Sequence, residues 1–294
     1  MKTLIIGDLH IDERSIPEIT TIFDNDIIPL VAGSHFDRII QLGDWFHYNR
    51  PTPLELKFSS ELVQNLQVYF KEVIILSGTG EHDLYHNESV ISHLASIGAK
   101  TVKGDYIEDN IFYGHFMLHE SRFAFGTGRM GIKDLAKYKY VFLGHQHSPQ
   151  ELTMKMFHVG SIRYCSFNEV NDKKEVMILQ DGLIANIELK APIPMVDILD
   201  VTKLEALAPM TKVRVIFNSF DEYKKNASYV NKMGKRFFQF KIKMNFEEAK
   251  KLDQSFIKLD STKSNKNNLI QSYIDKIEDK DIKEMLDKQF KEAI

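Results

Sequence analysis

Acidic residues and histidines stand directly after short apolar runs along the first half of the chain. TLIIGD (3–8) ends at Asp8, and RIIQLGD (38–44) ends at Asp44. Histidines end or follow comparable runs, at His10, His115, His145 and His147. Asp and His together suit Mn²⁺, Fe²⁺ or Zn²⁺, and the D-x-H and H-x-H spacings put two side chains on one face of an extended segment. A single motif of this kind more often belongs to core packing. Because such residues follow several apolar runs, however, we predict a metal site.

The elements that must position these residues are short strands alternating with helical patterns. Residues 1–97 alternate in this way, which is typical of parallel strands buried on both faces. In such a sheet the loops at the carboxyl ends of the strands converge on one crevice. Later apolar runs, between 110 and 189, have shorter connections and indicate a second sheet. We therefore predict an α/β fold, a two-sheet sandwich flanked by helices, over residues 1–190.

The rest of the chain differs in pattern. Residues 190–210 hold three prolines and indicate a domain edge, and 211–244 read as a β-α-β unit. We expect a small α+β domain over 191–250 and, from polar composition, a flexible linker over 251–268. Apolar residues at helical spacing predict one or two amphipathic helices over 269–294.

Composition sets the class of protein. With 43% hydrophobic and 27% charged residues the chain is an ordinary globular protein, and no apolar run is long enough to cross a membrane. Its single cysteine, Cys165, permits no internal disulfide and is expected to be a packing residue. We expect a cytoplasmic protein. Residues 1–200 carry 18 Lys and Arg against 27 Asp and Glu, a net −9, while 201–294 carry 20 against 14, a net +6. An acidic front suits cations, and a basic rear suits a polyanion or is simply a solvated surface.

Five motifs taken in order carry a family resemblance. GDLHID, GDWFHYNRP, GEHD, YGHFML and LGHQHSPQ resemble the successive motifs of the calcineurin-like metallophosphoesterases. More narrowly, GDWFHYNRP, LGHQHSPQ and HVGSIRYCSFNE resemble the nuclease subunit of the SbcC–SbcD double-strand-break repair complex, which has phage, archaeal and eukaryotic counterparts. The resemblance covers residues 1–190.

This resemblance implies a site for two Mn²⁺ ions, with Mg²⁺ or Fe²⁺ as alternatives. It implies metal 1 on Asp8, His10 and His147, metal 2 on His115 and His145, and Asp44 bridging the two. His82 would then act as the acid for the leaving group or stabilise the transition state, and His47 would orient the phosphate. Two divalent ions would activate a water and neutralise charge on the attacking and leaving oxygens.

Glu81 departs from the family pattern, which has an asparagine ligand to metal 2 at that place. A glutamate still offers an oxygen but cannot donate to the phosphate. If Glu81 binds the metal, it should hold the ion more tightly and attract the phosphate less, so that Glu81→Asn raises turnover. Alternatively the longer turn, with Thr79 and Gly80, directs Glu81 away, or the residue is an engineered change.

The activity implied is that of a Mn²⁺-dependent DNA nuclease, exonucleolytic on duplex ends and endonucleolytic on single strands or hairpins. The resemblance further implies a DNA-contacting capping domain, an SMC-like coiled-coil ATPase partner bound by the C-terminal helices, and a homodimer. Candidate phosphate contacts are Lys224, Lys225, Lys232, Lys235 and Arg236. Candidate dimer residues, which core packing explains equally well, are Phe58, Leu62, Leu66, Ile91 and Leu94.

Two other functions stay open. One is a different phosphodiesterase or phosphatase on the same scaffold, although Trp45, Phe46 and His47 follow Asp44 where phosphoprotein phosphatases have Asp-Arg-Gly. The other is a catalytically weak scaffold that binds DNA ends and retains its metals.

Overall fold

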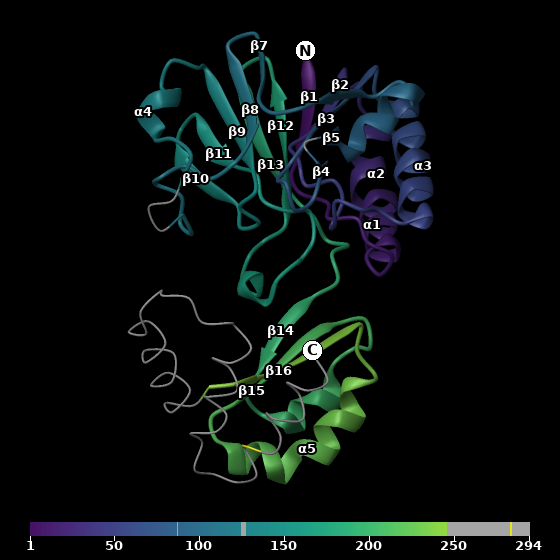
Figure 1. The fold of residues 1–294 in the computed structure, drawn as a ribbon, viewed down its shortest axis with the longest axis vertical. Coiled ribbons are helices and arrows are strands. Elements are labelled where there is room, and N and C mark those ends of the chain that lie inside the picture. The colour runs from purple at the N-terminus through teal and green to yellow at the C-terminus, as the bar shows by residue number, and fades with distance from the viewer. Residues whose placement is uncertain (87, 125–127, 246–282, 284–294) are drawn as a thin grey trace. The chain divides into compact units, whose positions relative to one another are not determined.

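The first sheet is built from the apolar runs that end at the predicted metal site (Figure 1). The structure, a computed structural model, describes residues 1–86, 88–124, 128–245 and 283. Six strands lie in the order β13-β12-β1-β2-β3-β6; β1, β2, β3 and β6 are parallel, and β12 and β13 form an antiparallel edge. Their bounds are β1 Lys2–Ile6, β2 Arg38–Gln41, β3 Glu72–Leu76, β6 Lys100–Val102, β12 Glu175–Gln180 and β13 Leu183–Glu188.

The second sheet has five strands in the order β10-β11-β9-β8-β7. Strands β8, β9 and β11 are parallel, while β7 and β10 pair antiparallel at the two edges. Their bounds are β7 Tyr106–Glu108, β8 Ile111–His115, β9 Tyr140–Gly144, β10 Gln150–Thr153 and β11 Met156–His158. A short hairpin, β4 Leu84–Tyr85 with β5 Glu88–Ser89, lies outside both sheets.

Three apolar clusters define the layers of this part of the chain. Between the sheets, alternate residues of the first, such as Ile40 and Ile74, pack against Tyr113 and Phe142 of the second. The opposite face of the first sheet packs against helices, and the opposite face of the second packs under α4. The helices are α1 Ile16–Ile22, the π-helix Phe23–Ile27, α2 Ile28–Ala32, α3 Pro53–Tyr69, the 3-10 helix Val90–Ile97 and α4 Ile132–Leu135. The predicted two-sheet α/β sandwich flanked by helices is thus confirmed.

Helix α3 shows why the sequence starts a helix at this place. Thr52 and Glu55 form a reciprocal capping box, and Pro53 occupies the first helical position, where its missing N–H costs nothing. The helix buries Leu62 and Leu66 in the core on the outer face of the first sheet. Ile91 and Leu94 join the same core, and Phe58 packs against it. Core packing therefore accounts for all five residues considered for a dimer interface.

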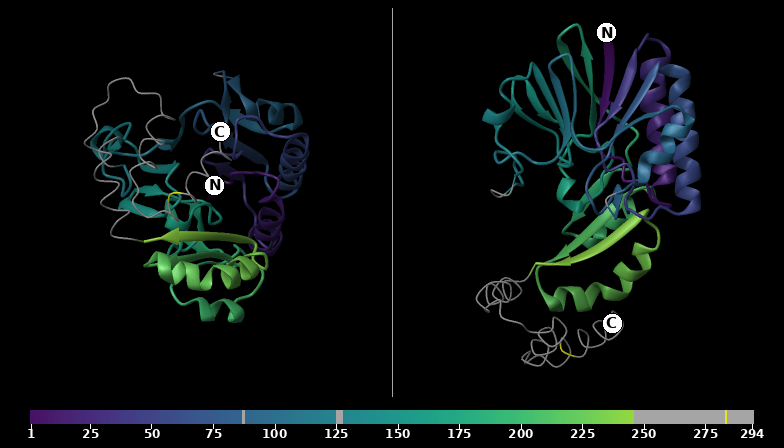
Figure 2. Two further views of the ribbon diagram at one scale, coloured as in Figure 1. Left: turned by 60° about the horizontal axis from the view of Figure 1, so that its bottom comes forward. Right: turned by 45° about the horizontal axis from the view of Figure 1, so that its top comes forward.

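A third sheet follows the sandwich in sequence, with order β14-β15-β16. Its strands are β14 Met195–Ile198, β15 Lys212–Phe217 and β16 Gln239–Met244, and α5 Phe220–Gly234 connects the last two. Figure 2 shows α5 running along one face of this sheet. The β-α-β pattern over 211–244 is therefore present. The proline-rich stretch before it, expected to be a domain edge, contains β14 and the 3-10 helix Val201–Ala206.

The domain limits expected from the sequence stay predictions. The chain divides into one compact unit of residues 1–217 with 221–243 and another of 218–220 with 244–294. The linker expected over 251–268 lies outside the described residues, as do the helices expected over 269–294 except for residue 283. Among the residues that the structure describes, no helix is long and apolar enough to cross a membrane.

A buried ion pair ties β15 to the first helix of the chain. Lys212 Nζ donates to both carboxylate oxygens of Glu18, at 2.9 and 2.7 Å, and to the Tyr164 carbonyl at 2.7 Å. Glu18 also accepts from the Ile193 amide at 3.0 Å, and an Arg163 nitrogen lies 3.8 Å from it. Because both charges are almost fully buried, either one without the other would be strongly destabilising.

Candidate metal centre

The loops that follow β1, β2, β8 and β9 bring the predicted ligands together. The amides of Leu9 and His10 donate to the Asp44 carbonyl, at 3.2 and 2.9 Å, which joins the first two loops. Three of the candidate ligands have left-handed backbone conformations: His10 with φ 49°, Asp44 with φ 50° and His145 with φ 77°. Such conformations cost about 1–3 kcal/mol each in non-glycine residues and cluster at functional sites. The fold thus holds these side chains in a strained but defined arrangement.

Two groups of potential metal-binding side chains share Asp44. The first consists of Asp8, His10 and Asp44, and the second of Asp44, His115 and His145; in each, the ligand atoms lie within 4.8 Å of one another. Asp44 Oδ2 lies 3.1 Å from His115 Nε2 and 3.9 Å from His10 Nε2. One carboxylate thus faces both groups, which are called the first half and the second half of the centre below.

His147 belongs to the first half. Its Nε2 lies 2.8 Å from His10 Nε2 and 3.6 Å from Asp8 Oδ2. Six of the seven residues predicted as metal ligands are therefore brought together.

Buried polar atoms without a partner show that the arrangement fits cations. Asp8 Oδ2 is buried and has no hydrogen-bond partner, and His115 Nε2, also buried, has only the Asp44 carboxylate oxygen beside it, at 3.1 Å. Such atoms are rare in folded proteins unless an ion or water satisfies them. Carboxylate oxygens and imidazole nitrogens are donors that suit Mn²⁺, Fe²⁺ and Zn²⁺. Several Asp and His groups could therefore hold divalent metal.

The ligands are oriented by groups behind them. His115 Nδ1 donates to the Leu42 carbonyl at 2.6 Å, and His147 Nδ1 lies 3.0 Å from a Glu169 carboxylate oxygen. With Nδ1 engaged, each imidazole presents Nε2 to the centre. The two halves thus use different supports, a backbone carbonyl in one and a buried carboxylate in the other.

Asp44 is fixed by the turn after β3. The Thr79 amide and hydroxyl both donate to Asp44 Oδ1, at 2.8 and 3.3 Å, which leaves Oδ2 facing the histidines. A Cβ on Gly78 would lie 2.0 Å from Asp44 Oδ1, so only glycine fits beside this carboxylate.

Asp83 holds the same turn to the loop after β2. Its carboxylate accepts from the amides of Trp45, Phe46 and Gly78, at 3.0, 3.1 and 2.8 Å. Burial, with the nearby Asp44, raises the pKa of Asp83 to about 6. The Asp83 carboxylate therefore has a structural role, because it bonds the amides of two loops.

His82 and His47 lie at the edge of the first half. The ring nitrogens of His10, His47 and His82 lie within 4.8 Å of one another, and His82 Nε2 is 3.8 Å from Asp44 Oδ2. His82 Nδ1 donates to the His47 carbonyl, which turns Nε2 inward. Burial lowers the pKa of His47, and this residue lines a cavity of about 500 Å³ together with Arg14, Tyr48 and others.

Charges in the centre oppose one another strongly. Burial by itself lowers the pKa of His115, but Asp8 and Asp44 raise it to about 9. Burial and the neighbouring His115 lower the pKa of His145 to about 4. Burial raises the pKa of Asp8. Burial also disfavours the charged form of Asp44, but the surrounding histidines hold its pKa below the ordinary value. The proton held by His115 is one that a metal ion would displace.

Glu81 is not brought to the other candidate ligands. Its side chain is exposed, and its carbonyl accepts from the Asn49 amide at 3.1 Å. It belongs to no group of potential metal ligands among the described residues. Thr79, two residues earlier, is the member of this turn that contacts Asp44.

Three residues of the segment after β11 contribute to the centre: Arg163 and Glu169, which the sequence did not single out, and Cys165, which was expected to be a packing residue. Arg163 donates to the carbonyls of Leu9 and His10, at 2.9 and 2.6 Å, and Glu169 contacts His147. Cys165 has its sulfur within 4.8 Å of the ring nitrogens of His10 and His147. Burial raises the pKa of this thiol to about 11. All three lie in HVGSIRYCSFNE, but no spacing rule links that segment to residues 8–10.

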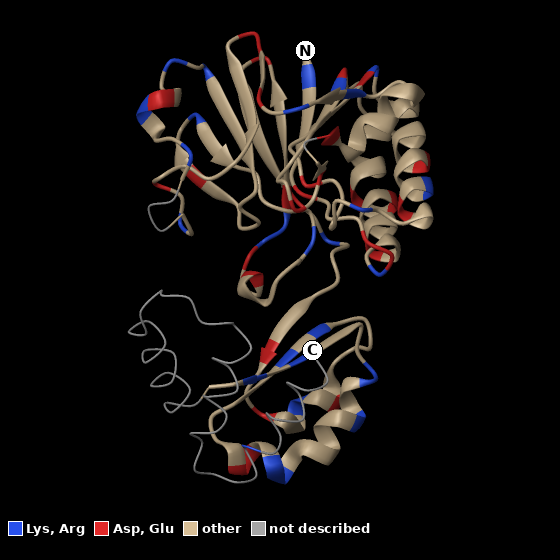
Figure 3. Ribbon diagram, viewed as in Figure 1, with Lys and Arg blue, Asp and Glu red and all other residues tan. Residues whose placement is uncertain are grey.

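The five candidate DNA-binding residues lie on α5 and directly after it, and all are exposed. Figure 3 marks Lys and Arg positions in blue along the ribbon of this helix. Arg236 donates to the carbonyls of Glu205 and Leu207, at 3.0 and 2.9 Å, so it also anchors the preceding 3-10 helix.

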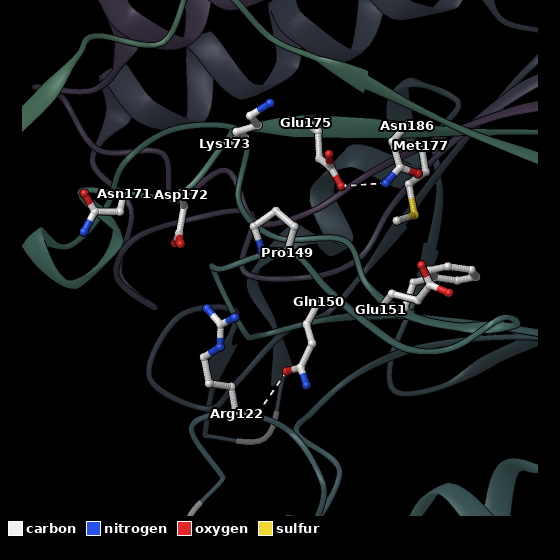
Figure 4. Close-up of a pocket in the computed structure, with 11 residues that line it drawn as sticks. Arg122, Pro149, Gln150, Glu151, Asn171, Asp172, Lys173, Glu175, Met177 and Asn186 are labelled. Atoms are coloured by element: carbon white, nitrogen blue, oxygen red, sulfur yellow. Dashed lines mark hydrogen bonds between the residues drawn. The ribbon is translucent and has the colours of Figure 1, made fainter.

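A separate polar cavity of about 370 Å³ lies where β10 and β11 approach β12 and β13 (Figure 4). The amide of Arg122 donates to Gln150, and Asn186 donates to Glu175, each at 2.9 Å. None of the predicted metal ligands lines this cavity.

No family model and no curated protein matches the sequence. Among solved structures, the chain is similar to the nuclease MPE of Pseudomonas putida, with 14% sequence identity and a TM-score of 0.33. The similarity covers 63% of this chain and 87% of that chain.

Proposed function

We propose that this chain is a Mn²⁺-dependent DNA nuclease that hydrolyses phosphodiesters at a two-metal centre. The observation that carries the proposal is the sharing of Asp44 between two groups of ligands. A carboxylate that faces both groups could be shared by two ions and would offset the repulsion between them, as suits a two-metal hydrolase. The five ordered sequence motifs support the same class of enzyme.

When bound, two divalent ions would supply an activated water and neutralise charge on the phosphate. The residues of this chain divide the remaining tasks. Asp8, His10 and His147 would hold one ion, His115 and His145 the other, and Asp44 both. Mn²⁺ is the metal we propose, with Mg²⁺ or Fe²⁺ as alternatives.

His82 is the proposed acid for the leaving oxygen. Its Nδ1 is engaged by the His47 carbonyl, so only Nε2 faces the centre, 3.8 Å from Asp44 Oδ2. An imidazole in that place can donate a proton to an oxygen that leaves the phosphate. His47, on the wall of the adjoining cavity, would orient the phosphate.

The proposed substrate is DNA, cleaved exonucleolytically at duplex ends and endonucleolytically in single strands or hairpins. Contacts with phosphates carry most of the non-specific affinity of a protein for DNA. Five exposed basic side chains suit such contacts: Lys224, Lys225, Lys232, Lys235 and Arg236. From the resemblance to the SbcC–SbcD nuclease subunit, we further propose a cytoplasmic ATPase–nuclease complex in recombination and repair, homodimeric and bound to an SMC-like ATPase through residues 269–294.

The test uses a labelled DNA duplex and an aryl phosphodiester, each with Mn²⁺ and with a chelator. We expect both to be hydrolysed with Mn²⁺ and neither with the chelator. His82→Asn should lower turnover by about 10²–10⁴-fold, the usual contribution of a general acid, while Mn²⁺ still binds. His86→Asn is the matched control, because His86 is exposed and belongs to no ligand group.

Other outcomes identify the alternatives. Hydrolysis of the aryl phosphodiester with intact DNA would indicate a small-molecule phosphodiesterase. DNA binding without either hydrolysis would indicate the end-binding scaffold. Full activity of His82→Asn would overturn the role given to His82.

A further inference from the structure

The cysteine of this chain lies inside the first half of the metal centre. Its sulfur and the ring nitrogens of His10 and His147 are all within 4.8 Å of one another. The thiol donates to the Arg163 carbonyl at 3.7 Å, and the Cys165 amide donates to Glu169 at 3.2 Å. The same carboxylate that orients His147 therefore also fixes the backbone that carries the sulfur.

A fourth donor completes the set. Asp8 Oδ2 is buried without a hydrogen-bond partner and lies 3.6 Å from His147 Nε2 and 3.9 Å from His10 Nε2. Tetrahedral zinc, with Zn–N of about 2.0–2.1 Å and Zn–S of about 2.3 Å, places neighbouring ligand atoms roughly 3.3–3.6 Å apart. The two nitrogens, 2.8 Å apart, and the carboxylate oxygen already lie close to that spacing. Zinc binding would bring the sulfur, which lies within 4.8 Å of both nitrogens, to the same spacing.

We propose that the first half of this centre is also a zinc site, in which Cys165, His10, His147 and Asp8 bind Zn²⁺ in competition with Mn²⁺. The inference builds on the metal centre of the proposed function and adds the thiol as a ligand and Zn²⁺ as a competing ion. On binding, the thiol loses its hydrogen bond to the Arg163 carbonyl, its proton passes to solvent, and a sulfur–zinc bond forms.

The choice of zinc follows from the donor set. Nitrogen and oxygen ligands already bind Zn²⁺ more tightly than Mn²⁺, and a thiolate widens the difference because it is a soft donor. Four protein ligands also close the coordination sphere, whereas a catalytic zinc site keeps one position open. Zinc held by all four residues should therefore inhibit hydrolysis rather than support it.

The second half provides an internal comparison. Asp44, His115 and His145 supply only oxygen and nitrogen ligand atoms, and the Cys165 sulfur is not grouped with them. Zinc selectivity that depends on sulfur should therefore be confined to the first half.

The test is cobalt spectroscopy on the full-length protein, because Co²⁺ follows zinc geometry and gives an ultraviolet charge-transfer band only when sulfur is a ligand. We expect the band in the wild-type protein, its absence in Cys165→Ala and Cys165→Ser, and its removal by added Zn²⁺. Serine keeps nearly the size and polarity of the side chain and removes only the sulfur, whereas alanine removes the whole group. Loss of the band in both variants therefore identifies the sulfur as the ligand.

Calorimetry gives the selectivity. Loss of a residue that hydrogen-bonds to a metal ligand lowers metal affinity by roughly 10–100-fold, and loss of a ligand itself should cost at least as much. We therefore expect Cys165→Ser to lower Zn²⁺ affinity by at least that factor and to change Mn²⁺ affinity by less than about threefold. Absence of the cobalt band, or equal losses for both metals, would overturn the proposal. Neither readout requires turnover, so a failure of the nuclease assay would leave this result interpretable.

Inhibition is the functional consequence. Zn²⁺ added to Mn²⁺-loaded protein should stop aryl phosphodiester hydrolysis at a concentration at least about tenfold lower in the wild-type protein than in Cys165→Ser. Equal inhibition of the two proteins would show that sulfur plays no part in zinc inhibition and would count against the site.

Discussion

The two halves of the metal centre differ in what holds their histidines. In the second half, His115 is oriented by the Leu42 carbonyl, a group that comes with the backbone of the fold. In the first half, His147 is oriented by Glu169, which itself accepts from Lys174 at 2.6 Å and from the Ser166 amide at 2.7 Å. The second half is thus set by chain geometry, and the first by side chains that single substitutions can change. This difference makes the two halves separable by experiment.

Asp44 is the exception, because both halves share it, and it should give the largest effect. We expect Asp44→Ala to lower Mn²⁺ affinity at both halves by more than the roughly 100-fold that an outer partner can cost. Titration calorimetry and bound-metal stoichiometry measure this, with Asp24→Asn on the outer π-helix as the control for a surface carboxylate. Loss of one ion with normal retention of the other would contradict the bridging role.

Glu169→Gln should separate the halves. The amide is neutral and no longer matches the Lys174 ammonium and the His147 N–H together, so we expect a roughly 10–100-fold loss of Mn²⁺ affinity in the first half only. Glu175→Gln, which changes a carboxylate on the separate polar cavity, is the matched control. A two-site titration in which both affinities fall equally would show that the halves do not have independent supports.

Acid should weaken the second half through His115, whose pKa is about 9. Below that pH the imidazole carries a proton that the ion has to displace, and above it the competition disappears. Between pH 7 and 9 the Mn²⁺ affinity should therefore rise by about tenfold per pH unit for one displaced proton. Calorimetry in buffers of different ionisation enthalpy counts that proton. Binding that releases none at pH 7 would show that His115 is already neutral in the free protein.

The turn after β3 should give the smallest effect. Thr79→Val removes the hydroxyl that donates to Asp44, a bond worth about 0.5–1.5 kcal/mol, so we expect Mn²⁺ affinity to fall by up to about tenfold. Glu81→Asn, at an exposed position, should change it by less than about twofold. A larger effect at Glu81 than at Thr79, or a rise in turnover for Glu81→Asn, would restore Glu81 as a ligand.

Periodicity and strand ends were sufficient to predict the sandwich. Runs buried on both faces became β1, β2 and β3, and the polar residues after them met because parallel strands end at one edge. The orientation of Asp44 could not be predicted in this way. It depends on a turn whose conformation places Thr79, not Glu81, against the carboxylate.

Cys165 and Glu169 were beyond the reach of the sequence argument for a different reason. Cys165 is about 155 residues from His10 in the sequence, although the two side chains lie close together. Glu169 is 22 residues from His147, which it contacts. Spacing rules describe one helix or strand, whereas these contacts come from the path of an irregular segment after β11. A cysteine without a partner in sequence was therefore taken for packing, although it lies beside two candidate ligands.

The ion pair between Glu18 and Lys212 has a consequence for synthesis of the protein on the ribosome. Arg163 supports the backbone of His10 and lies 3.8 Å from Glu18, so the first metal-binding loop is linked to a charge whose partner comes 194 residues later. A nascent chain that ends before residue 212 would bury Glu18 without the Lys212 ammonium, with Arg163 at 3.8 Å as its remaining cationic neighbour, which is a less stable arrangement. The loop that carries His10 should therefore gain stability once β15 has been translated. A chain still in synthesis would then bind metal at this loop more weakly than the complete chain.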